Sequence, residues 1–220
     1  VAGTHGKTTT STLIAHILKN AGLDVTAFLG GISSNYNTNL LLGMDRSSKA
    51  VVVVEADEYD RSFLALSPNI AVITSMDPDH LDIYGTADEM EKSFIQFTQN
   101  LKEEGLLISK KGLSREKDLS GDIHLTYHLR NTTADIHAVN LKVENGSYKY
   151  DVKGAGWSIE NMKLNMGGLH NVENSLVAIS IAKHLGIEDG KIQHAIESFK
   201  GVKRRFEYIV RNEDHVYIDD

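Results

Sequence analysis

The chain has 220 residues, of which 41% are hydrophobic and 24% are charged, and its formal net charge is −7. This composition is typical of a folded globular protein and excludes a disordered chain, while the negative charge argues against nucleic-acid binding, which needs a basic surface. No apolar run reaches the roughly 18 residues of a membrane span, the first residues do not resemble a signal peptide, and the absence of cysteine excludes disulfides and thiolate metal sites. We therefore expect a cytoplasmic protein with no nucleic-acid partner and no membrane span.

The first half of the chain alternates predicted helices and strands. Apolar residues recur every three or four positions over residues 8–21, which predicts an amphipathic helix, and a second helix is predicted over residues 86–100. Residues 30–48 are rich in glycine, serine and asparagine and predict a long polar loop. The run over residues 50–55 is typical of a parallel strand buried on both faces. Including this run, four short apolar runs are typical of strands and cover residues 24–29, 50–55, 69–74 and 105–109.

The pattern changes after residue 109. Residues 110–121 are charged and predict a surface segment, and short strand patterns recur over residues 122–164, where Asn145-Gly146 is typical of a hairpin turn. Two helices and two strands are predicted in the remainder: residues 171–185, 189–199, 206–210 and 215–218. The sequence therefore predicts an α/β fold with a mostly parallel sheet and a small antiparallel insertion at about residues 122–164.

The most informative segment is Gly3-Thr4-His5-Gly6-Lys7-Thr8-Thr9, which opens the first predicted helix. Glycines let backbone amides converge on phosphate oxygens, and the positive end of the helix dipole points to the same place. In such a loop Lys7 reaches the β- and γ-phosphates and the Thr8 hydroxyl binds Mg²⁺. The general loop pattern has a glycine where this chain has Val1, but the loop and the helix together predict phosphate binding.

Six motifs in order resemble the Mur ligases, the ATP-dependent enzymes that build the peptide stem of peptidoglycan. They are Gly3-Thr4-His5-Gly6-Lys7-Thr8-Thr9, Glu55-Ala56-Asp57-Glu58, Asp77-Pro78-Asp79-His80-Leu81-Asp82, Gly168-Leu169-His170-Asn171-Val172-Glu173-Asn174, Gly201-Val202-Lys203-Arg204-Arg205-Phe206 and Asp219-Asp220. The resemblance covers essentially the whole chain. It implies ATP and Mg²⁺ as cofactors, and it is greatest for the branch that joins L-alanine to UDP-N-acetylmuramate.

The resemblance also implies a domain organisation. Residues 1–220 are expected to be one central ATP-binding domain, with a UDP-binding domain before it and an amino-acid-binding domain after it. A strand is expected before a phosphate loop, and the sequence holds at most Val1 and Ala2 of that strand. We therefore interpret the chain as a piece of a longer protein that is inactive alone, the alternative being a complete small protein.

The metal site is expected after two of the predicted strands. Glu55 ends a strand at the edge where an open α/β sheet binds ligands, and the family assigns this glutamate to Mg²⁺. The family also places a metal-ligating histidine at His80, so the expected ligands are Thr8, Glu55 and His80. The alternatives are a helix-capping or salt-bridged role for Glu55 and a structural role for His80. Asp57 and Glu58 are expected to contribute only a negative electrostatic potential or a structural role.

Three further positions of the family's nucleotide site fall late in the sequence. His170, Asn171 and Asn174 open a predicted helix, where the resemblance implies nucleotide contact and the alternative for Asn171 is helix capping. The family uses one arginine near Arg204 and Arg205 for the γ-phosphate; Arg204 is preferred, and the choice stays open. The family's ribose-binding aspartate matches Asp220.

One position departs from several relatives. They carry a carbamoylated lysine in the helix after the metal-binding histidine, where this sequence has Phe94, and Lys92 nearby is expected to be a surface residue. Whether the second metal site of those relatives exists here therefore stays open. The catalytic residues expected are Lys7, Glu55, His80 and Arg204, acting in amide formation through an acyl phosphate. Two alternatives remain: a ligase that attaches recycled murein tripeptide to UDP-N-acetylmuramate, and a non-catalytic nucleotide-binding module.

Overall fold

The computed structural model describes residues 1–44, 50–144, 146–212 and 215–219. Its helices are α1 (Lys7–Asn20), α2 (Leu81–Tyr84), α3 (Ala87–Gln99), α4 (Leu169–His184) and α5 (Asp189–Ser198), with short 3-10 helices at Ser62–Ala65 and Glu116–Asp118. Its strands are β1 (Val25–Ser33), β2 (Thr38–Leu41), β3 (Val51–Val54), β4 (Ile70–Ile73), β5 (Leu106–Lys110), β6 (Ile123–His128), β7 (Ile136–Glu144), β8 (Ser147–Gly154), β9 (Trp157–Leu164), β10 (Glu207–Arg211) and β11 (Val216–Asp219).

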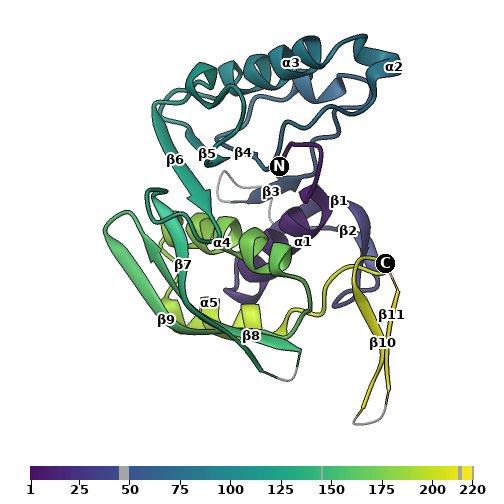
Figure 1. Ribbon diagram of the computed structural model, residues 1–220, viewed down its shortest axis with the longest axis vertical. Helices are drawn as coiled ribbons and strands as arrows, with labels where there is room; N and C mark the ends of the chain where they lie inside the picture. Colours follow the sequence, from purple (N-terminus) through teal and green to yellow (C-terminus); the bar gives the residue numbers. More distant parts are fainter. Residues whose placement is uncertain (45–49, 145, 213–214, 220) are drawn as a thin grey trace.

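The first two residues join two sheets. One sheet has the order β2-β1-β3 and the other has the order β4-β5-β6-β7-β8-β9. Val1 exchanges hydrogen bonds of 2.8 Å with β3 and the residues after it, while Ala2 bonds on its other side to Val72 and Thr74 at 2.9 and 3.0 Å. The start of the chain therefore lies between β3 and β4 and makes one continuous surface of the two sheets (Figure 1).

Parallel pairing dominates the centre of this surface. The pairs β1–β3, β4–β5, β5–β6 and β6–β7 are parallel, whereas β1–β2, β7–β8 and β8–β9 are antiparallel. The predicted α/β fold with a mostly parallel sheet and a small antiparallel part is confirmed. Strand β6, which the sequence places in the antiparallel part, instead pairs parallel with both neighbours, and β7 to β9 extend the same sheet.

The prediction of a polar loop over residues 30–48 is wrong in part. Strand β1 continues to Ser33 and turns back into β2, so that Ser33 pairs with Thr38. Residues 45–49 of this segment, and Asn145 of the predicted hairpin turn, lie outside the described residues. The antiparallel pairing of Glu144 with Ser147 nevertheless agrees with a hairpin at that point.

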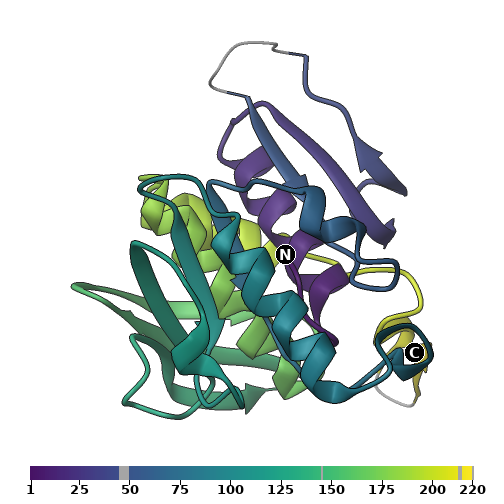
Figure 2. The same cartoon turned by 90° about the horizontal axis from the view of Figure 1, so that it is seen from above.

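Two apolar cores cover the two faces of the sheet. Alternate residues of β5 point to opposite sides: Leu106 and Ile108 join the core under α1, α4 and α5, whereas Leu107 joins the core with Phe63, Phe94 and Phe97. Figure 1 shows α2 and α3 above β4 and β5, with α1, α4 and α5 below, and Figure 2 shows α3 on the near side. This arrangement is the reason why the parallel strands are apolar on both faces.

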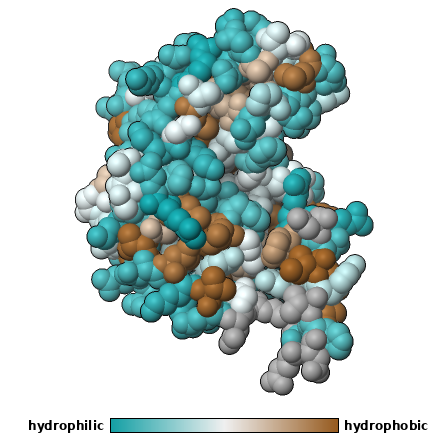
Figure 3. Space-filling model, viewed as in Figure 1, coloured by the Kyte–Doolittle hydropathy of each residue, from teal (hydrophilic) through white to brown (hydrophobic). Residues whose placement is uncertain are grey.

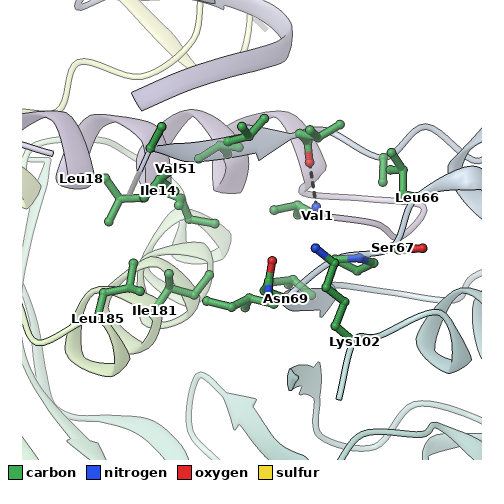
Figure 4. A pocket seen from close by; sticks show the side chains of 18 of the residues that line it. Val1, Ile14, Leu18, Val51, Leu66, Ser67, Asn69, Lys102, Ile181 and Leu185 are labelled. Atoms are coloured by element: carbon green, nitrogen blue, oxygen red, sulfur yellow. Dashed lines mark hydrogen bonds between the residues drawn. The ribbon is translucent and has the colours of Figure 1, made fainter. Parts of the chain in front are cut away.

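A cleft of about 680 Å³ lies beside Val1, between β3 and the segment that leads into β4 (Figure 4). Apolar side chains of α1 and α4 line one side of it, including Ile14, Leu18 and Ile181, together with Leu185 just after α4. Its lining does not include residues 3–9, so this cleft is separate from the phosphate loop.

Among the helices in the described part of the chain, none combines the length and the apolar character of a membrane span. The face seen in Figure 3 is largely hydrophilic, with separate apolar patches. It is notched on its right side, between the part that carries α2 and α3 and the C-terminal pair β10–β11.

Candidate active site

The phosphate loop connects Val1 and Ala2, which lie between β3 and β4 in space, to helix α1. Gly6 is the N-cap residue of α1 with φ 84°, and the first turn of this helix contains no acidic residue. The helix therefore contributes no carboxylate of its own to its positive end, which favours an anion at this place.

The segment after β4 holds the phosphate loop through hydrogen bonds. The Thr74 hydroxyl donates a hydrogen bond of 2.5 Å to the carbonyl of His5, and the backbone amide of His5 donates one of 2.7 Å to Oγ of Ser75. Gly3 has φ 128°, and a Cβ at this position would lie 2.2 Å from Oγ1 of Thr74. Both the backbone conformation and the close approach require glycine at this place.

Thr8 and Glu55 meet at the start of α1. The Thr8 hydroxyl donates a hydrogen bond of 2.8 Å to Oε1 of Glu55, and the backbone amide of Gly30 donates one of 2.7 Å to Oε2. One hydroxyl and one carboxylate beside a phosphate loop fit Mg²⁺, which takes one or two protein oxygens and completes its shell with phosphate oxygens and water. Thr8 and Glu55 are therefore the residues that would hold this ion.

In the described part of the chain, His80 makes no hydrogen bond, ion pair or ring contact with Thr8 or Glu55. Its side chain contacts Asp79, whose Oδ2 lies 3.8 Å from Nε2, and the Tyr59 ring, whose centre lies 5.1 Å from that of the imidazole. Among residues 1–44, 50–144, 146–212 and 215–219, no three His, Asp or Glu side chains form a group suited to a metal. His80 itself has φ 49° and caps α2. Its metal role stays a prediction.

Lys7 is paired with a carboxylate that the sequence analysis left without a specific role. Its Nζ atom lies 2.8 Å from both Oε1 and Oε2 of Glu58 and donates a further hydrogen bond of 2.9 Å to the carbonyl of Gly3. Glu58 is fully buried. Removing one partner of a buried ion pair costs about 3–5 kcal/mol, because the other charge is left uncompensated.

The three polar residues at the start of α4 have different surroundings. Asn174 is buried against the phosphate loop, since a Cβ at Gly6 would lie 3.0 Å from its Oδ1. Asn171 is buried and donates a hydrogen bond of 2.7 Å from Nδ2 to the carbonyl of Gly167. His170 is exposed, and its ring centre lies 6.1 Å from that of Phe206. Only Asn174 of the three is placed against the loop.

The C-terminal motif approaches the site through Val202. This residue pairs with Ser33 of β1, and a Cβ at Gly31 would lie 2.7 Å from its side chain and 3.1 Å from that of Thr8. Arg204 and Arg205 are both exposed, and the backbone amide of Arg204 bonds to Glu207. The choice between the two arginines stays open, and Asp220, the expected ribose ligand, lies outside the described residues.

Phe94, at the position where several relatives carry a carbamoylated lysine, and the nearby Lys92 differ in their surroundings. Phe94 is fully buried in the core beneath α3, and Lys92 is exposed and pairs with Asp88 and Glu89 at 2.7 and 2.8 Å. Lys92 is thus a surface residue, as predicted.

Sequence reasoning missed three features of the site. These are the partner of Lys7, the support from Thr74 and Ser75, and the close approach of Gly30 and Gly31. The paired glycines were a usable signal, because glycine inside a strand often marks a close approach of backbone. The other two depend on contacts between residues about 50 to 70 positions apart and leave no local pattern.

Comparison with known proteins places this site in a family. Residues 1–182 match the family described as Mur ligase middle domain. Over all 220 residues the chain is 48% identical to a Christiangramia forsetii protein named UDP-N-acetylmuramate–L-alanine ligase, of which it covers 46%. The chain thus spans about half the length of the curated relatives it matches.

Two solved structures extend the comparison. A crystal structure of UDP-N-acetylmuramate-alanine ligase from Thermotoga maritima superposes with a TM-score of 0.83 at 30% identity, covering 99% of this chain and 49% of that one. A crystal structure of UDP-N-acetylmuramate:L-alanyl-gamma-D-glutamyl-meso-diaminopimelate ligase from Neisseria meningitides superposes with a TM-score of 0.76 at 27% identity. The superposition covers 92% of this chain and 65% of that one. Together with the family match over residues 1–182, these likenesses identify the chain as a member of the Mur ligase family.

Proposed function

We propose that the chain is the ATP-binding domain of a longer ligase that joins L-alanine to UDP-N-acetylmuramate. The observation that carries the proposal is the convergence of Lys7, Thr8 and Glu55 at the start of α1 in a chain of this family. The name of the 48% identical relative supports L-alanine as the amine. The reaction consumes ATP, and we propose a cytoplasmic location for it.

In the proposed reaction, a carboxylate oxygen of UDP-N-acetylmuramate attacks the γ-phosphorus of ATP. ADP leaves, and an acyl phosphate forms. The amine of L-alanine then attacks the acyl carbon, and phosphate leaves as the amide forms. In this domain Lys7 and the amides at the start of α1 would neutralise charge on the transferred phosphoryl group. Mg²⁺, when held by Thr8 and Glu55, would neutralise further charge.

The related tripeptide ligase is the second candidate. Its support is the likeness to the Neisseria meningitides structure, which at 27% identity is weaker than the 48% identity to the alanine-named relative. Competition between L-alanine and the tripeptide L-Ala-γ-D-Glu-meso-diaminopimelate for the full-length protein separates the two. We expect L-alanine to be the amine incorporated.

The nucleotide site is tested by calorimetric titration of ATP into the chain, with and without Mg²⁺. Thr8→Val keeps the shape of the side chain and removes the hydroxyl, whereas Thr8→Ser keeps the hydroxyl. We expect the gain in ATP affinity from Mg²⁺ to be lost in Thr8→Val and retained in Thr8→Ser. Equal Mg²⁺ dependence in both variants contradicts the assigned site.

Turnover by the full-length protein tests the reaction itself. Lys7→Ala is expected to abolish amide formation, and near-normal turnover in this variant contradicts the proposal. ATP binding without any amide product in the full-length protein would instead indicate a non-catalytic nucleotide-binding module.

A further inference from the structure

Glu58 is a buried charged residue to which the proposed reaction assigns no step. Its side chain is 1% exposed, and that of Lys7 is 13% exposed. Nζ of Lys7 lies 2.8 Å from each carboxylate oxygen. Among the described residues, Lys7 is the only one with an ion pair or side-chain hydrogen bond to this carboxylate, so the lysine is the cation that balances it.

The backbone of Glu58 is held from two sides. Its carbonyl accepts a hydrogen bond of 2.5 Å from the Tyr84 hydroxyl at the end of α2, and one of 3.1 Å from the backbone amide of Arg61. The Arg61 guanidinium in turn lies 4.7 Å from the centre of the Tyr84 ring. The backbone of Glu58 is therefore anchored by contacts that do not involve Lys7.

The contacts of Lys7 differ in what their loss would cost. An ammonium group has three N–H donors, and here they face the carboxylate of Glu58 and the neutral carbonyl of Gly3. Losing a neutral acceptor costs less than leaving a buried carboxylate without its cation. A phosphate oxygen that reaches Lys7 is therefore expected to replace the carbonyl of Gly3 and to leave the contact with Glu58 intact.

We propose that Glu58 is a positioning residue that holds the Lys7 ammonium at the phosphate loop both before and after the nucleotide binds. Glu55 and Glu58, three residues apart, then have different roles. Glu55 faces Thr8 and the expected metal position, and Glu58 faces the lysine. The inference rests on the proposed nucleotide site, but its first test needs no nucleotide.

The first test measures how fast acetic anhydride acylates Lys7 in the nucleotide-free chain, followed by peptide mass spectrometry. Glu58→Gln removes the charge that pairs the lysine, so Lys7 is expected to react at least tenfold faster. The matched control is Glu89→Gln, since Glu89 pairs with a different lysine, the exposed Lys92, at 2.8 Å. It is expected to change the reactivity of Lys7 less than twofold. Unchanged protection of Lys7 in Glu58→Gln overturns the proposal.

The second test measures Mg·ATP binding by calorimetry. A lysine that is no longer held in place is expected to bind the nucleotide at least tenfold more weakly in Glu58→Gln. Unchanged or tighter binding overturns the proposal, because it would mean that Glu58 competes with phosphate for the lysine.

A third variant covers the case in which Glu58→Gln does not fold. Glu58→Asp keeps the charge and withdraws the carboxylate by one methylene group. We therefore expect a smaller increase in Lys7 acylation and a smaller loss of Mg·ATP affinity than in Glu58→Gln. No change in Lys7 reactivity in a folded Glu58→Asp chain then overturns the proposal. Failure of the unsubstituted chain to bind Mg·ATP contradicts the proposed nucleotide site, and the acylation rates still decide the role of Glu58.

Discussion

The backbone amide of Gly30 donates a hydrogen bond of 2.7 Å to Oε2 of Glu55, while the other oxygen of this carboxylate accepts the Thr8 hydroxyl. One side chain thus connects the middle of β1, the residue that follows β3 and the start of α1. The orientation of the expected metal ligand is therefore set by a strand that contributes no ligand of its own.

Gly30→Ala tests this connection. A Cβ at Gly30 would lie 2.3 Å from Oε1 of Glu55, so the carboxylate or the strand must shift. We expect Mg²⁺-dependent ATP affinity to fall at least tenfold, about 1.4 kcal/mol, as measured by calorimetry. The matched control is Gly190→Ala in α5, where a Cβ meets nothing within 4 Å. This control is expected to leave ATP binding unchanged and to raise stability by on the order of 0.5 kcal/mol; equal affinity in the two variants contradicts the prediction.

Asn171 and Asn174 are expected to respond differently to alanine. Asn174→Ala removes a carboxamide that lies against Gly6, so ATP affinity should fall while the free energy of unfolding changes little. Asn171→Ala removes a buried hydrogen bond to the carbonyl of Gly167, so the free energy of unfolding should fall by about 1–2 kcal/mol with little effect on ATP affinity. Calorimetry and urea unfolding of both variants measure the two quantities. The reverse assignment of the two effects would show that Asn171 is the nucleotide contact.

His16 should make the chain less stable in mild acid. It is 3% exposed, its ring nitrogens lie 3.0 Å from the Tyr36 hydroxyl and 3.2 Å from that of Ser198, and burial lowers its pKa to about 4. The unfolded chain takes up this proton near pH 6.5 and the folded chain only near pH 4, so the contribution to stability is present above pH 6.5 and is lost as the pH falls to 4. The loss is on the order of 3 kcal/mol.

Urea unfolding between pH 7.5 and pH 4 measures this loss. His16→Gln is expected to be less stable at pH 7.5 and to show a shallower dependence on pH, because it no longer has the titrating ring. The control His215→Gln replaces an exposed histidine and should leave the slope unchanged. A slope that is the same in all three proteins assigns the acid sensitivity to other groups.

Local patterns predicted most of the elements correctly. The spacing of Leu13, Ile14, Ile17 and Leu18 predicted α1, which runs from Lys7 to Asn20. The structure buries this helix on all sides from Thr8 to Leu18, which the amphipathic pattern did not indicate. The second half of β1 was missed because Gly30-Gly31 and the polar residues after it are typical of a loop. Pairing with β2, with Glu55 and with Val202 makes this segment a strand, and that pairing is not a local property.

The sequence by itself determined the family, the phosphate loop and its helix, and the alternation of strands and helices, since each depends on residue type and short-range spacing. Only the tertiary structure decided which distant groups meet. Thr8 and Glu55 are 47 residues apart, and Lys7 and Glu58 are 51 residues apart. They meet because Val1 and Ala2 lie between β3 and β4, which brings the phosphate loop beside the residues that follow β3. Apolar periodicity specifies which face of a strand is buried, but not which strand becomes its neighbour, and the neighbour is what pairs Lys7 with Glu58.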